Sequence, residues 1–184
     1  MAPGRAMSAG PVPAAAIAAA VASARALLRM TGEDEAALLA SLAAAAIGLA
    51  EAFVGQPLLV RAMEDVLTAG RAWQPLAASP VRAIQGVTAV PVDGAPWVLG
   101  ADSYAVDIDA TGRGWVRLTA PAEVGRVAVQ YSAGLAADWD AVPAPIVHGV
   151  VLLIAHLFEN RASEAAPPSA VAALWRPWRR MRLR

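Results

Sequence analysis

Residues 127–161 decide the fold, and they read VAVQYSAGLAADWDAVPAPIVHGVVLLIAHLFENR. The first residues alternate apolar side chains with small or polar ones, which is typical of a strand with one covered face. After two prolines, Ile146, Val150 and Ile154 recur at helical spacing within a wide apolar face. The stretch therefore predicts a strand, a turn and a helix over 145–161, and we expect this helix at the centre of the core.

The same period of two runs upstream from this strand. Residues 104–108 and 116–118 alternate in the same way, and turn signals separate them. Residues 81–90 predict a further strand, with an irregularity at Gly86. Residues 58–76 are ambiguous, and we assign them to strands because they adjoin the others. We therefore expect an antiparallel β region over residues 58–131.

Helical spacing predicts two helices before this region, over 14–29 and 33–54. Ile17, Val21 and two leucines lie near one face of the first, and the second is expected to end at Gly55. With 145–161 these helices form a small bundle into which the β region is inserted, so the fold class is α+β with segregated strands and an extended C-terminal arm. The expected division is a disordered leader (1–13), one domain (14–168) and a short helix with a basic arm (169–184).

Charge is distributed unevenly along a chain whose formal net charge is zero. All 15 basic residues are Arg, and cysteine is absent, which excludes disulfides, thiolate nucleophiles and Cys-ligated zinc. Residues 1–30 sum to +3, residues 31–174 to −8 and residues 175–184 to +5. The sequence therefore predicts an acidic body with a basic tail that meets a partner.

The tail interleaves bulky apolar side chains with arginines. Arginine forks bind carboxylate or phosphate, and tryptophan supplies contact area. Three interpretations remain open: docking on an acidic protein groove, contact with nucleic acid, or a solubilising end. The candidate binding residues of this arm are Trp175, Arg176, Trp178, Arg179, Arg180, Arg182 and Arg184.

Catalytic and metal-ligating patterns are weak, so we expect no enzyme, no cofactor and no metal. His148 and His156 lie about 80° apart around one helix, and Asp107 with Asp109 is a weak candidate for a divalent ion. No phosphate-binding, dinucleotide-binding or nucleophile-elbow motif is present in the sequence. The residues that close the helix are instead interpreted as a helix-end or subunit-interface cluster: His156, Glu159, Asn160 and Arg161.

Two apolar segments of the sequence have possible membrane-related roles. The Ala-rich run 14–20 followed by Ala22-Ser23-Ala24 resembles a secretory signal, although prolines precede it. The apolar stretch 146–158 contains two histidines and is too short to span a bilayer. We therefore expect a protein inside the cell with no membrane partner.

Several segments, in order, resemble the tailed-phage head–tail connector (adaptor) family. The family shows a strand ending in Tyr-x-Ala-Gly, a Val-Pro before the main helix and an aromatic-Glu-Asn-Arg helix end. The corresponding segments here are Val127–Gly134, Val142–Ile146 and Leu152–Arg161, with further likeness at Ala26–Leu42, Ala50–Leu58, Ser79–Val90, Tyr104–Asp107 and Gly114–Leu118.

The resemblance implies a structural protein at the head–tail junction of a virion, assembled in the bacterial cytoplasm. Such a protein forms a ring of about twelve copies under the portal protein, extends the DNA channel without recognising sequence, and supports a stopper or tail-terminator protein. Its C-terminal arm engages the portal, a role that carries over to 175–184. The Lys-free composition suits a gene transfer agent as well as a phage. The alternative is a nucleic-acid-binding module that uses the basic tail.

Overall fold

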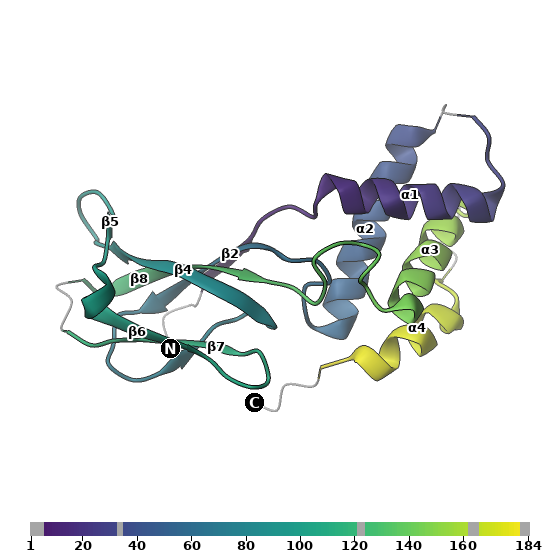
Figure 1. The fold of residues 1–184 in the computed structure, drawn as a ribbon. Helices are drawn as coiled ribbons and strands as arrows, with labels where there is room; N and C mark the ends of the chain where they lie inside the picture. The colour runs from purple at the N-terminus through teal and green to yellow at the C-terminus, as the bar shows by residue number, and fades with distance from the viewer. Residues whose placement is uncertain (1–5, 33–34, 121–123, 162–165, 181–184) are drawn as a thin grey trace. The chain divides into compact units, whose positions relative to one another are not determined.

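The computed structural model describes residues 6–32, 35–120, 124–161 and 166–180, and it divides the chain into two compact units (Figure 1). The β unit comprises Met1–Pro11 and Val60–Leu135, and the helical unit comprises Val12–Leu59 and Ala136–Arg184. The predicted α+β class, with an antiparallel β region inserted between helices, is confirmed.

The β unit contains two antiparallel sheets. The five-stranded sheet has the order β1 (Ala6–Ala9), β2 (Arg61–Thr68), β8 (Arg126–Ala133), β4 (Val81–Val90) and β5 (Trp97–Val98). The three-stranded sheet has the order β3 (Gln74–Pro75), β7 (Gly114–Leu118) and β6 (Tyr104–Ile108), and a 3-10 turn, η1 (Ala101–Ser103), precedes β6. Residues 58–76 therefore do contribute strands, as the sequence predicts.

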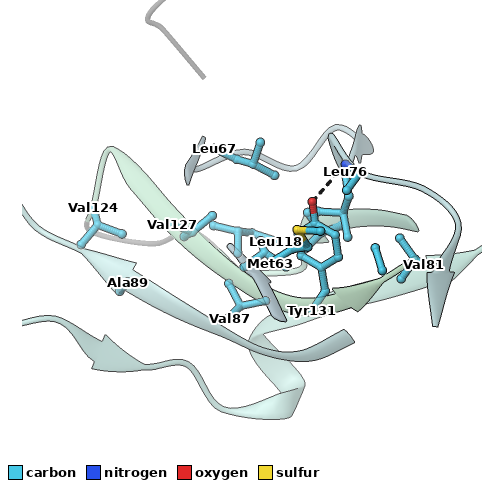
Figure 2. Close-up of a cluster of buried hydrophobic side chains, with 14 residues drawn as sticks. Met63, Leu67, Leu76, Val81, Val87, Ala89, Leu118, Val124, Val127 and Tyr131 are labelled. Atoms are coloured by element: carbon cyan, nitrogen blue, oxygen red, sulfur yellow. Dashed lines mark hydrogen bonds between the residues drawn. The ribbon is translucent and has the colours of Figure 1, made fainter. Parts of the chain in front are cut away.

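Alternate side chains of both sheets meet in one core, shown in Figure 2. Tyr131 of β8 carries the polar centre of this core, because its hydroxyl accepts a hydrogen bond from the Ala78 backbone N–H (3.1 Å) and donates one to Asp65 Oδ1 (3.1 Å). The other oxygen of the fully buried Asp65 carboxyl accepts the Ala77 N–H at 2.6 Å. This network satisfies polar groups whose burial without partners would destabilise the fold.

Two details of the strands test the sequence analysis. The register of β4 against β8 shifts between Ile84 and Gly86, which confirms the irregularity expected at Gly86. The prediction of a disordered leader over residues 1–13 is wrong for 6–9, which form β1 and pair with β2 from Ala6↔Val66 to Ala9↔Met63. Local composition could not reveal this strand because its hydrogen-bond partners lie more than fifty residues away.

The helical unit is built around α3 (Ala144–Glu159), which packs against each of the other α-helices. Its buried face includes Ile146, Val150 and Ile154, so the helix expected at the centre of the core is confirmed there. The other elements are α1 (Ala14–Leu28), α2 (Ala36–Val54), α4 (Ser169–Trp175) and the 3-10 turn η2 (Arg176–Trp178).

The helix ends follow the predictions in part. Gly55 ends α2 in the left-handed conformation (φ 76°), as expected. α2 begins at Ala36 with Glu35 in the N-cap position, three residues after the start expected at residue 33. α4 begins at Ser169, directly after Pro168 in the N-cap position.

The buried stripe of α1 consists of alanine, and half of the buried residues of α2 are alanine as well. In α1 the buried residues are Ala16, Ala20 and Ala24, while Ile17 and Val21 remain partly exposed on another face. By length and composition alone α2 could cross a membrane. A buried core helix passes the same test, and the alanine-rich stripe of α2 packs against α3.

Candidate functional site

The C-terminal arm begins with the short helix α4, which is apolar on one side. Its seven residues read SAVAALW, and Val171 and Trp175, four positions apart, share a buried face. Residues at i and i+4 lie one above the other on a helix, so both can reach the same neighbour. α4 packs mainly against α3, and the 3-10 turn η2 continues it to Trp178.

Trp175 is an internal anchor of the helical unit. Its side chain is only 3% exposed, and its indole Nε1–H donates a hydrogen bond to the Ile146 carbonyl oxygen at 3.2 Å. The ring lies 5.8 Å, centroid to centroid, from the ring of Phe53 at a tilt of 58°. Space for the indole exists because position 149 is glycine, where a Cβ would lie 2.3 Å from Trp175 Nε1.

The next residues of the arm are fixed at the C-terminal end of α2. The Arg180 backbone N–H donates to the Val54 carbonyl oxygen at 2.9 Å, and the Arg179 guanidinium carbon lies 5.8 Å from the Phe53 ring centroid. Cationic side chains are favourable here because the helix C-terminus carries partial negative charge. The arm is thus held against the helical unit as far as Arg180.

This geometry corrects one member of the predicted binding arm. Trp175 is buried in its own unit, so it is unavailable as an exposed contact while the arm is docked. Arg176, Arg179 and Arg180 are exposed and Trp178 is half-buried. Arg182 and Arg184 lie outside the described residues, so the described surface of the arm begins at Arg176.

Within the predicted helix-end cluster His156 pairs with Asn160, whereas Arg161 pairs with Glu35, which lies outside the cluster. The Asn160 amide donates to the His156 carbonyl oxygen at 2.9 Å and lies 3.2 Å from the His156 ring Nδ1. Arg161 forms an ion pair with Glu35 at 3.1 Å, and its guanidinium lies 4.8 Å from the Phe158 ring centroid. The Arg161–Glu35 ion pair ties the end of α3 to the start of α2. Glu159 is exposed.

The weak catalytic and metal candidates belong to different units of the chain. His148 is exposed on α3. Asp109 accepts hydrogen bonds from Thr111, from Arg113 and from the Trp115 indole, and these bonds lower the pKa of its carboxyl well below the ordinary value of 3.8. Among the described residues, no three His, Asp or Glu side chains gather in a way that could hold a metal ion.

The charges that are separated along the sequence are balanced within each of the two units. The β unit contains seven Arg and seven acidic residues, and the helical unit contains eight of each. The predicted acidic body therefore spans both units, and the arm belongs to the helical unit by position in the chain. The β unit also pairs an arginine with an aromatic ring, since the Arg117 guanidinium carbon lies 4.8 Å from the Trp73 ring centroid.

Sequence reasoning missed the residues that receive the arm, namely Phe53, Val54 and Gly149. A glycine in the middle of an otherwise bulky apolar helix was the available signal. Gly149 costs helix stability relative to alanine, so its presence indicates that a large group packs directly on the helix backbone there.

Three solved chains from gene transfer agent (GTA) particles resemble this chain over nearly its whole length. A chain from the neck of an empty GTA particle computed with C6 symmetry is 29% identical, with a TM-score of 0.78 and 97% of both chains covered. A chain from the virion of a native GTA particle is 27% identical, with a TM-score of 0.72 and 96% of both covered. A chain from the neck of a native GTA particle computed with C12 symmetry is 30% identical, with a TM-score of 0.73, covering 96% of this chain and 97% of that one.

No protein-family model matches the chain, and a search of curated proteins gives no match. The solved structures define its class, which is that of structural proteins of a virion neck. Since identity reaches 30% over nearly the full length of both chains, the chain belongs to the family of GTA neck proteins.

Proposed function

We propose that this chain is the head–tail adaptor of a GTA particle. In this role it forms a ring under the portal protein, extends the DNA channel and supports the stopper or tail-terminator protein. The observation that carries the proposal is the near-full-length likeness to a neck chain computed with C12 symmetry, together with the ordered adaptor motifs. A ring of about twelve copies fits that symmetry.

The arm is proposed to bind the portal through residues 176–184. Arg176, Arg179 and Arg180 are exposed on a segment whose backbone is fixed to the end of α2, and this arrangement pre-organises them for an acidic groove. Trp175 acts indirectly, because its burial sets where the arm starts. Trp178, half-buried, is the aromatic residue left to contribute contact area.

A charge-removal experiment tests this assignment. Arg176→Gln with Arg180→Gln should leave the helical unit folded and reduce the fraction of DNA-filled heads that carry tails. The matched control is Arg71→Gln with Arg126→Gln, which removes the same charge from exposed positions of the β unit. The proposal fails if the arm variant attaches tails as well as the control does.

DNA is proposed to pass through the ring without sequence recognition. Each unit has balanced charge, so a wall made from either one would bind phosphates weakly and slow the DNA little.

The alternative function is nucleic-acid binding by the basic arm. The stacked Arg117–Trp73 pair gives this alternative a second basic and aromatic surface in the β unit. If all five arm arginines contacted duplex phosphates, the logarithm of the binding constant would fall with log salt at a slope of about −4 to −5. A titration of the isolated protein with duplex DNA separates the two functions, since the adaptor role predicts a much shallower slope.

A further inference from the structure

The hairpin between β4 and β5 presents apolar side chains on both of its flanks. Val92, Trp97 and Val98 are 92%, 46% and 77% exposed. Trp97 pairs with Ala89 and Val98 with Thr88, so the alternation of strand side chains directs them to opposite sides of the sheet. Figure 1 shows the loop before β5 projecting from the rest of the β unit. A groove, which has two sides, could cover the apolar side chains on both flanks of this hairpin.

The helical unit contains a groove of that kind. α1 and the start of α2 line an open groove of about 820 Å³ with Ile17, Ala18, Val21, Met30, Ala36 and Ala40, among others. The volume lies within the range of roughly 300–1,000 Å³ that is typical of sites able to bury a small ligand. The groove exists because α1 buries its alanine stripe against the core and leaves the Ile17 and Val21 face partly exposed.

We propose that the β4–β5 hairpin of one copy inserts into the α1–α2 groove of the next copy in the ring. This inference rests on the proposed ring and names the contact that builds it. A cyclic ring needs a heterologous interface, in which two different surfaces of each subunit meet. The hairpin and the groove are two such surfaces, both apolar and each carried once by every chain.

Charge complementarity selects a second copy as the occupant. The hairpin segment 91–98 carries one charged residue, Asp93, and among the described residues that line the groove the charged one is Arg25. Opposite charges at the rim of an apolar contact fix register and disfavour wrong partners. The Arg25 side chain also donates to the Gly32 carbonyl oxygen, which holds its guanidinium at the end of α1 next to the groove.

Disulfide trapping in particles tests the contact, because the chain has no cysteine of its own. Val98→Cys is combined with Ala18→Cys, and Ala18 is an exposed residue of the groove. The double variant is produced in cells where it replaces the wild-type chain. After oxidation of purified particles, the proposal expects a ladder of covalent multimers well above the dimer. Each single-cysteine chain should give no species above the dimer. The matched control combines Val98→Cys with Ala52→Cys, an exposed α2 residue outside the groove lining, and should give no ladder.

A charge reversal provides an independent readout that leaves the cysteine positions untouched. Asp93→Arg and Arg25→Asp should each reduce the number of chains per particle several-fold, and the two together should restore it. If the chain is incorporated into particles but no ladder forms, or if the disulfide joins the two units of one monomer, the hairpin contact is wrong while the adaptor function stands. If immunoblots find no chain in the particles, the adaptor function itself is wrong.

Discussion

Gly149→Ala should detach the C-terminal arm from the helical unit. A Cβ at this position would lie 2.3 Å from Trp175 Nε1, 2.9 Å from Cε2 and 3.0 Å from Cδ1, and these are atoms of a rigid, buried ring. Overpacking of this kind costs about 1–3 kcal/mol, and loss of the indole bond to Ile146 costs about 1 kcal/mol more. Alanine returns about 1 kcal/mol of helix propensity. The free energy of unfolding of the helical unit should therefore fall by about 1–3 kcal/mol.

The chain offers a matched control on a neighbouring helix. Gly48 lies within α2, and a Cβ there would meet nothing within 4 Å. Gly48→Ala should therefore stabilise the helical unit by up to about 1 kcal/mol, the difference in helix propensity. The same substitution on two helices is thus expected to change stability in opposite directions.

Hydrogen exchange of the α4 amides is the assay, because it reports the helical unit separately from the β unit. Trp175→Phe, with a smaller ring and no N–H donor, should cost less in the Gly149→Ala background than in the wild type, so the double-mutant cycle should show a coupling of at least about 1 kcal/mol. The reasoning is refuted if Gly149→Ala stabilises the protein as Gly48→Ala does, or if the two sites show no coupling.

Three further substitutions test the β unit. Tyr131→Phe should lower the free energy of unfolding, measured by urea denaturation, by about 1–3 kcal/mol. The substitution removes the hydroxyl that bonds to the buried Asp65 carboxyl and to the Ala78 N–H. Asp109→Asn should lose stability relative to the wild type at neutral pH, and the difference should shrink as the pH falls below about 4. The sign follows because the folded-state pKa of Asp109 is lowered, so its contribution is present above the ordinary pKa of 3.8 and is lost on acidification; an unchanged difference down to pH 2 would contradict it. Gly112→Ala should destabilise the β6–β7 turn, since this residue has φ 76° and its Cβ would lie 2.8 Å from the Pro80 Cβ; thermal unfolding at the wild-type temperature would contradict that.

Local patterns in the sequence predicted the elements that local physics determines. The alternation over 81–90 gives β4 with its predicted bounds, and Gly55 ends α2 where a left-handed residue was expected. The strand β1 was missed because its pairing with β2 is a contact between distant segments. An edge strand of four small or flexible residues has no local signature.

The candidate site was predicted as a segment rather than as a surface. The composition of 175–184 drew attention to the arm, but it treated both tryptophans alike. Their difference depends on Gly149 and Phe53, which lie 26 and 122 residues before Trp175 and whose contact with its ring only the folded unit reveals. The charge separation along the chain does not follow the division into two units, since the arm and eight of the acidic residues belong to the same helical unit.

The assembly described here also depends on how the alanine stripe of α1 is used. Burial of Ala16, Ala20 and Ala24 allows close packing against the rest of the unit, and it leaves the larger side chains of α1 on the groove. A helix that buried Ile17 and Val21 instead would have closed the surface that we propose for the next subunit.

The most direct test of the adaptor function is to locate the chain in the particle. An N-terminal fusion to a compact protein tag, imaged by electron cryomicroscopy of tailed particles, should add a symmetric ring of extra density at the neck, next to the portal and on its tail side. About twelve equivalent tag densities are expected around the ring, in keeping with the C12 symmetry of the related neck chain. Tag density in the head shell, along the tail tube or at the tail tip would contradict the account.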